Sequence, residues 1–335
     1  VVMKTLWHFV SKAFLSIVGL CCGVVLAFVV IFALIASSLG NGDATFVSLP
    51  DAQGEVKDLG KTAPIIAVIE MKDVIASSKN TAKTIQNILE GFEKAPLKDR
   101  VKGIVIDMDC PGGEVFEIDR IYSMLRFWKE RKGFPIYIYV NGLCASGGYY
   151  VSCAATKIYA TSSSLIGSIG VRSGPFFNVK EGLNRYGVES DLLTAGKDKA
   201  PMNPYTPWTS HDREERQATL DFLYGQFVDI VTQNRPLLTK EKLVHTLGAR
   251  IFSPEKAKQE GYIDVVGATK EQVLQDIVAV CKIEDNYRVI GSGGDGWWKR
   301  VASAAASSPL VTGMIKHDIL PLSHDAAYIP PYLAL

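Results

Sequence analysis

The longest apolar stretch of the chain lies near its N-terminus. Positions 14–39 hold no charged residue, and the stretch exceeds the roughly 20 residues that a helix needs to span a bilayer. It is also longer than the roughly 7–15 apolar residues of a cleaved signal peptide, although small residues at 36–38 leave processing open. Lysines precede the stretch and Asp43 follows it, so the positive-inside rule predicts a cytoplasmic N-terminus. We expect a cytoplasmic segment over 1–13, a transmembrane helix over 14–39 and the remainder on the periplasmic or extracellular side.

Beyond a polar linker predicted over 40–62, short apolar runs alternate with segments whose apolar residues recur at helical spacing. The apolar runs predict strands over 63–70, 101–109, 136–140, 157–160, 165–171 and 189–193. The periodic segments predict helices over 81–92, 114–131, 149–155, 179–186, 212–233, 254–260 and 271–281. This alternation is typical of an α/β fold in which crossover helices cover both faces of a sheet. We assign 63–285 to one domain and 286–335, with its Gly-rich start and Ala/Ser run, to a low-complexity tail.

The charge and residue composition of the chain indicate which classes of ligand it is suited to bind. Lys and Arg number 36 against 35 for Asp and Glu, so the balanced charge argues against a nucleic-acid ligand. Hydrophobic residues make up 47% of the chain, which is ample for a core. The six cysteines lack the short paired spacing of a zinc site, and we interpret most of them as small buried hydrophobic residues. No metal or cofactor is predicted.

Glycine-bearing turns follow three of the predicted strands, and loops at strand ends are where ligands gather in α/β sheets. The turns are Cys110-Pro111-Gly112-Gly113, Ala145-Ser146-Gly147-Gly148 and Ile166-Gly167-Ser168-Ile169-Gly170. Ser146 would stand where a strand gives way to a helix. That position suits an exposed nucleophile with backbone N–H donors for an oxyanion, but it equally suits an ordinary helix N-cap serine.

A nucleophilic serine also needs a base. None of the five histidines lies beside a glycine turn in the sequence, so a Ser-His-Asp triad is an alternative without local support. A lysine can replace histidine when burial in apolar surroundings lowers its pKa and frees the neutral amine. Lys197 and Lys199 follow the strand predicted over 189–193, where a lysine could point back to the sheet edge. On composition alone, the same residues also suit a solvated turn.

The motifs as a set resemble the signal peptide peptidase A family in order and spacing. This family consists of membrane-bound serine proteases with a Ser/Lys dyad, related in fold to Clp protease and the crotonases. The resemblance covers roughly 65–280 and the N-terminal anchor, and the single catalytic unit is similar to the short form of the family. It rests on these segments: Asp109-Cys110-Pro111-Gly112-Gly113, Ala145-Ser146-Gly147-Gly148-Tyr149-Tyr150, Gly167-Ser168-Ile169-Gly170-Val171, Thr194-Ala195-Gly196-Lys197-Asp198-Lys199 and Phe252-Ser253-Pro254-Glu255-Lys256-Ala257.

The resemblance implies a role for each matching position. Ser146 is the expected nucleophile, and Lys199, three residues after the glycine, is its expected general base. The backbone N–H groups of Gly113 and Gly147 are expected to form the oxyanion hole, and the Ser168 hydroxyl to orient the lysine amine. At two positions this chain has a cysteine where the family usually has another residue. They are Cys110, where serine is usual, and Cys144, just before the nucleophile. Neither change removes a catalytic group.

The resemblance also implies partners and a location. Substrates would be released signal peptides or other hydrophobic peptides near the membrane, cleaved without a cofactor. The protein would sit in a bacterial inner membrane as a ring- or dome-shaped homo-oligomer, in which a neighbour can supply part of the active site. Two alternatives remain. A crotonase-type acyl-CoA enzyme explains the glycine turns but neither Lys199 nor the anchor, and a catalytically silent membrane scaffold could keep the same fold.

Overall fold

The computed structural model describes residues 46–57, 59–60, 62–76, 80–283 and 286–292, together with 23, 26 and 27. Apart from those last three positions, the predicted transmembrane segment lies outside the described residues, and so does the predicted tail beyond Ser292. Within the described part of the chain, no helix combines the length and the apolar character needed to cross a membrane.

Strands and helices alternate along the described chain. The strands are β1 (Phe46–Leu49), β2 (Ile65–Lys72), β3 (Val101–Cys110), β4 (Ile136–Ala145), β5 (Lys157–Ala160), β6 (Leu165–Gly167), β7 (Ile251–Phe252), β8 (Val265–Val266) and β9 (Arg288–Ser292). The α-helices are α2 (Ala82–Gly91), α3 (Val115–Lys132), α4 (Gly147–Ser152), α5 (Lys180–Arg185), α6 (Ser210–Asn234), α7 (Pro254–Glu260) and α8 (Lys270–Val280). A π-helical turn, η1, covers Lys242–Leu247.

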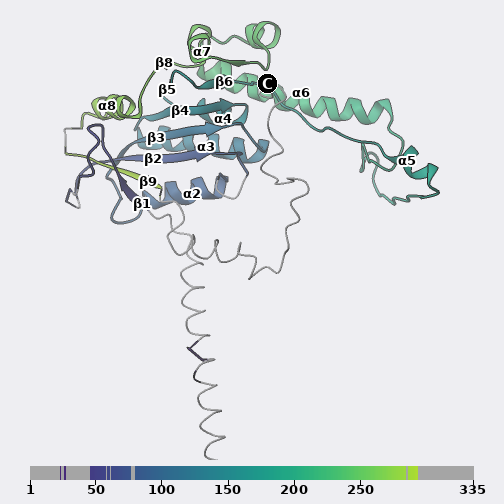
Figure 1. Cartoon of the computed structure of the whole chain (residues 1–335), viewed down its shortest axis with the longest axis horizontal. Helices are drawn as coiled ribbons and strands as arrows, with labels where there is room; N and C mark the ends of the chain where they lie inside the picture. Colours follow the sequence, from purple (N-terminus) through teal and green to yellow (C-terminus); the bar gives the residue numbers. More distant parts are fainter. Residues whose placement is uncertain are drawn as a thin grey trace, which may run out of the picture. The chain divides into compact units, whose positions relative to one another are not determined.

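One sheet organises these elements (Figure 1). Its strand order is β1-β9-β2-β3-β4-β5-β8, with β6 beside the end of β4 and β7 beside β6. From β9 through β8 the neighbouring strands are parallel, whereas β1 joins β9 antiparallel and β7 joins β6 antiparallel. Parallel neighbours need crossover connections, and α2 and α3 supply them between β2, β3 and β4.

Alternate residues of each strand enter two separate cores, because successive side chains of a strand point to opposite faces of the sheet. In β2, Ile65 and Ile69 belong to the core formed with α2, α3 and α4, whereas Ile66 and Val68 belong to the core formed with α8. The central strands are therefore buried on both faces. The predicted α/β sheet with helices on both faces is confirmed.

Three details differ from the expectations. The strand predicted over 189–193 is wrong, because those residues are exposed and have no strand partner. Two strands fall outside the range predicted for the domain. They are β1, in the predicted linker, and β9, in the predicted tail. β9 pairs with both β1 and β2, and its Val289 and Ile290 are buried. Such short runs lack the periodicity that reveals a longer element. Finally, β6 ends at Gly167 instead of continuing to 171, because positive φ angles at Gly167 (132°) and Ser168 (55°) turn the chain.

Candidate active site

Three strand ends meet at one edge of the sheet, and each carries one of the glycine-bearing turns. Cys110 at the end of β3 is the register partner of Cys144 in β4. One residue further, Ala145 at the end of β4 is the partner of Gly167 at the end of β6. Because these strands run parallel, the residues that follow them lie side by side at their carboxyl ends. The structure thus brings together three motifs that the sequence could only place in order.

Ser146 sits on a sharp turn between β4 and α4, with φ 52° and ψ −120°. Few residues other than glycine adopt a positive φ, and such strain gathers at functional sites. The backbone N–H of Ser146 donates to the carbonyl oxygen of Gly167 at 2.9 Å, which holds the turn in place. Its side chain makes no capping hydrogen bond to α4. Ser146 therefore occupies the N-cap position of α4 without capping it through its side chain. The hydroxyl is left for other chemistry, as in the strand-turn-helix arrangement of nucleophilic serines.

Backbone donors flank this serine on the helix side. The N–H of Gly147 opens α4, and the first N–H groups of a helix have no acceptor within the helix. The first intrahelical bond runs from the N–H of Tyr150 to the carbonyl of Ser146, at 3.0 Å. The N–H of Gly147 is thus available beside the serine hydroxyl.

A second donor comes from the turn after β3. There, the carbonyl of Gly112 accepts from the N–H of Ile75 at 2.8 Å, and the N–H of Glu114 donates to the carbonyl of Ile75 at 3.2 Å. In an extended chain, successive peptide groups point to opposite sides, so the N–H of Gly113 points away from Ile75. The donors expected from Gly113 and Gly147 are thus both free of these backbone bonds.

Gly112 has a role that the sequence did not single out within its motif. Its φ is 116°, and a Cβ there would lie 2.9 Å from both the Gly147 nitrogen and the Ser146 Cβ. Only a residue without a side chain allows the turn to pack this closely against the serine. The signal in the sequence was a glycine directly after a proline at a strand end, which on its own predicts no more than a turn.

Asp109 is a second residue that the sequence did not assign to the site. Its Oδ1 accepts from the backbone N–H of Leu143 at 2.8 Å, at the point where the pairing of β3 with β4 shifts register. A Cβ on Gly142 would collide with the same carboxyl group. Asp109 therefore fixes the stretch of β4 that leads into Ser146.

Ser168 follows β6 as Ser146 follows β4. Its φ of 55° nearly equals the 52° of Ser146, and its N–H donates to the carbonyl of Arg250 at 2.8 Å. Because Ala145 and Gly167 are register partners, the two serines are the next residues on neighbouring parallel strands. The role expected for Ser168, orienting the lysine amine, stays a prediction.

Lys199 belongs to the connection between β6 and α6, where it is exposed. This connection includes α5, which with its flanking loops lies beyond the end of α6 in Figure 1. Within the described part of the chain, no hydrogen bond or ion pair joins Lys199 to Ser146. Lys197 is 84% exposed and lies 3.9 Å from Asp198. The assignment of Lys199 as the base stays a prediction.

The alternative nucleophiles and bases are poorly placed. His211 faces Asp198 at 3.3 Å, and His245 is exposed on η1. Burial raises the pKa of the Cys110 thiol to about 11 and that of Cys144 to about 12. Both thiols stay protonated at neutral pH, and thiols are nucleophilic only as thiolates. The two cysteines beside the serine therefore act as small buried side chains, as expected.

The fold and the site together define an α/β protein of the Clp protease-like class with a serine on a strained turn. Residues 52–166 match the Clp protease family, and residues 129–279 match peptidase family S49. A putative protease of Synechocystis sp. is 31% identical over 258 residues, which cover 71% of this chain and 86% of that protein. The chain belongs to peptidase family S49, a family of serine-type proteases. The resemblance to the signal peptide peptidase A family is confirmed.

Other relatives agree with this assignment. A putative protease of Methanocaldococcus jannaschii is 32% identical over 63% of this chain and 66% of its own length. The putative signal peptide peptidase SppA of Enterococcus faecium is 29% identical over 60% of this chain and 57% of its own length. The chain thus spans about two thirds or less of these two relatives. A solved membrane-bound stomatin-specific protease in complex with a substrate peptide covers 73% of this chain at 16% identity, with a TM-score of 0.43.

Proposed function

We propose that this chain is a membrane-anchored serine endopeptidase that cleaves released signal peptides and other hydrophobic peptides close to the membrane. The observation that carries the proposal is the backbone of Ser146, at φ 52° and ψ −120°, with a side chain that caps no helix. A serine that served only as a cap would accept from the start of α4 and would need no strained conformation. Strain that contributes nothing to the helix is expected where it presents a reactive group.

The proposed reaction is acyl transfer. The Ser146 hydroxyl attacks the scissile carbonyl, and its proton passes to the neutral amine of Lys199. The N–H groups of Gly113 and Gly147 hold the negative oxygen of the tetrahedral intermediate. Lys199 then protonates the leaving amine, and water, deprotonated by the same lysine, resolves the ester on Ser146.

We further propose that Lys199 reaches Ser146 of a second copy in a homo-oligomer. The connection that carries Lys199 also exposes large apolar side chains, with Phe177 at 72%, Tyr186 at 87% and Leu193 at 89% of their surface. Where such side chains gather into one patch, they mark an interface. A partner that covers this surface would also desolvate Lys199, which is the change that lowers the pKa of an amine.

Membrane attachment rests on the apolar stretch over 14–39 and places the domain on the outer side of a bacterial inner membrane. An anchored protease meets substrates that leave the same bilayer, which favours hydrophobic peptides. The E. faecium relative bears the name signal peptide peptidase, which supports the same substrate class. If the topology is correct, a protease added outside spheroplasts digests the region after Asp43.

The test of the nucleophile is covalent labelling. The detergent-solubilised full chain is treated with a fluorophosphonate probe, and wild type is compared with Ser146→Ala and with a control, Ser163→Ala, at an exposed serine. We expect labelling of wild type and of Ser163→Ala, and none of Ser146→Ala. Unchanged labelling of Ser146→Ala would show that another residue is the nucleophile. Wild type that stays unlabelled and cleaves no peptide would instead favour the silent scaffold.

A further inference from the structure

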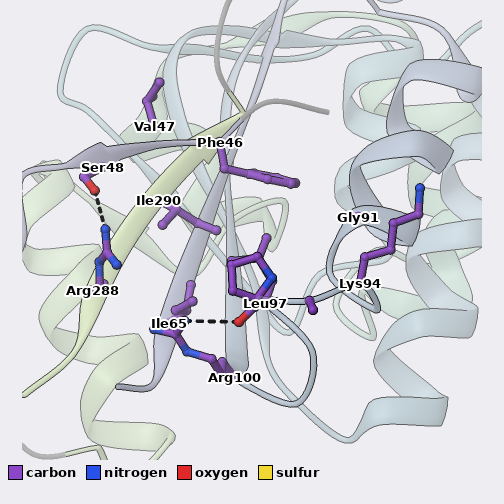
Figure 2. A pocket seen from close by; sticks show the side chains of 12 residues that line it. Phe46, Val47, Ser48, Ile65, Gly91, Lys94, Leu97, Arg100, Arg288 and Ile290 are labelled. Atoms are coloured by element: carbon purple, nitrogen blue, oxygen red, sulfur yellow. Dashed lines mark hydrogen bonds between the residues drawn. The ribbon is translucent and has the colours of Figure 1, made fainter. Parts of the chain in front are cut away.

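A pocket of about 370 Å³ lies at the opposite end of the strands from Ser146 (Figure 2). It is enclosed by β1, β9, the start of β2 and the connection from α2 to β3. Ile65, which begins β2, is part of its wall, whereas Ser146 follows the end of β4. Since β2, β3 and β4 are parallel, the two sites lie at opposite edges of the sheet.

The pocket combines apolar walls with positive charge. Phe46, Leu97 and Ile290 supply apolar surface. Every ionisable side chain that lines it in the described part of the chain is basic: Lys94, Arg100 and Arg288. A chain with a net charge of +1 has no general excess of cations, so this gathering is local. The lining suits a ligand with an anionic group attached to an apolar body.

The two arginines are close enough to affect each other. Burial lowers the pKa of the Arg100 guanidinium, and the positive charge of Arg288 lowers it further. Arg100 donates to the carbonyl oxygens of Ala63 at 2.9 Å and Pro96 at 3.1 Å, which fixes its position. A negative charge between the two guanidinium groups would remove their repulsion.

Arg288 also holds a donor without an acceptor. One of its terminal nitrogens donates to the Ser48 hydroxyl at 2.8 Å, a bond drawn in Figure 2. Its Nε is buried and has no hydrogen-bond partner among the described residues. Leaving a buried charged donor unpaired is unfavourable, and such groups call for an unseen partner. Arg288 lines the pocket, so an anion held there would lie beside its guanidinium charge.

The location of the pocket relative to the predicted membrane segment indicates which anion is available. Phe46 follows Leu39, the end of that segment, by seven residues, and seven residues extend at most roughly 25 Å. If the segment spans the bilayer, the pocket wall at Phe46 is within reach of the lipid headgroups. We propose that the pocket binds the phosphate of an anionic phospholipid between Arg100 and Arg288, with the glycerol and upper acyl chain against the apolar wall. This inference rests on the proposed anchoring but not on the proposed catalysis.

The test measures lipid binding to the full chain in a non-ionic detergent. The probes are dioctanoyl phosphatidylglycerol, dioctanoyl phosphatidylcholine and inorganic phosphate, and binding is followed by native mass spectrometry and by the shift in Tm. We expect phosphatidylglycerol to bind about tenfold or more tightly than the other two. Arg288→Gln should weaken that binding about tenfold, the effect of losing a hydrogen bond to a charged group.

Two further variants test the interpretation. Arg288→Lys keeps the charge and should keep most of the binding. Arg126→Gln, on the exposed face of α3, is the matched control and should bind normally. Equal binding of phosphatidylcholine, equal binding of inorganic phosphate, or unaltered binding by Arg288→Gln would each overturn the proposal. Fluorophosphonate labelling of Ser146 should be unchanged in Arg288→Gln, so failure of this site and failure of the catalytic assignment are separable.

Discussion

The backbone N–H of Ser146 donates to the carbonyl of Gly167 at 2.9 Å, and this bond joins the ends of two neighbouring parallel strands. It has two consequences for the site. Because the N–H of Ser146 is already used, an oxyanion beside the serine must rely on the next N–H, that of Gly147. Because Gly167 is held at this point, Ser168 emerges directly beside Ser146 with nearly the same φ. One hydrogen bond thus positions both Ser146 and Ser168.

The choice between two nearby lysines is testable by substitution. Lys199→Ala should lower kcat/KM for a hydrophobic fluorogenic peptide by about 10²–10⁴-fold, the range for loss of a general base. Lys197→Ala should keep most of the activity, because Lys197 is 84% exposed and its partner is the adjacent Asp198. The opposite pattern would identify Lys197 as the base.

Sharing of the site between copies predicts complementation. Ser146→Ala and Lys199→Ala chains, each inactive alone, should regain activity when they are co-expressed in one assembly. In a ring of randomly mixed copies, about one quarter of the sites would pair an intact serine with an intact lysine. Peptide cleavage by the purified mixture measures this fraction. If both groups come from the same chain, the mixture has no intact site and stays inactive.

Gly112→Ala should damage catalysis more than folding. The added Cβ would lie 2.9 Å from the Gly147 nitrogen and 3.1 Å from the Ser146 Oγ, at a φ of 116° that alanine rarely adopts. We expect kcat to fall by about 10²–10³-fold, the loss seen when an oxyanion donor is misplaced. Gly225→Ala, where a Cβ meets no atom within 4 Å, is the control and should leave kcat unchanged. A Gly112→Ala enzyme with normal kcat would contradict the packing of this turn against the serine.

Acid should weaken the attachment of α7 to η1. Glu260 accepts from Lys242 at 2.8 Å and Lys256 at 2.5 Å, and these bonds lower its pKa from 4.5 to about 2. A carboxyl group whose pKa is lower in the folded state stabilises the protein fully above pH 4.5. That contribution disappears as the pH falls through about 2.

Glu260→Gln should therefore lower Tm at pH 7 by about 2–4 °C, which corresponds to roughly 1 kcal/mol in a domain of this size. The difference from wild type should shrink as the pH falls from 4.5 to 2. Scanning calorimetry at several pH values measures it, and Glu214→Gln, an exposed residue of α6, is the control. A difference in Tm that is independent of pH would argue against the two ion pairs.

The elements that could be predicted from the sequence are those whose own residues show a clear apolar pattern. β3 is apolar over most of its length because both faces of the sheet bury it, and such strands read as continuous apolar runs. The helix α6 was predictable from its length and from the buried Phe227 and Val231. By contrast, β1 and β9 are short, and each becomes a strand only through its partners: β9 pairs with β2 and β1, and β1 pairs with β9. The strand expected over 189–193 has similar residues but no such partner.

Residue type and local spacing are enough to predict the α/β alternation and the chemical groups available at each strand end. Which of those groups meet depends on how the strands pair, and no local pattern encodes that. Gly113, Ser146 and Ser168 are far apart along the chain and become neighbours solely through the parallel pairing of β3, β4 and β6. The side chain of Ser146 does not cap α4, and this depends on a backbone conformation that residue type does not reveal. Lys199 lies on an exposed segment outside the strands, and its assignment as the base stays a prediction.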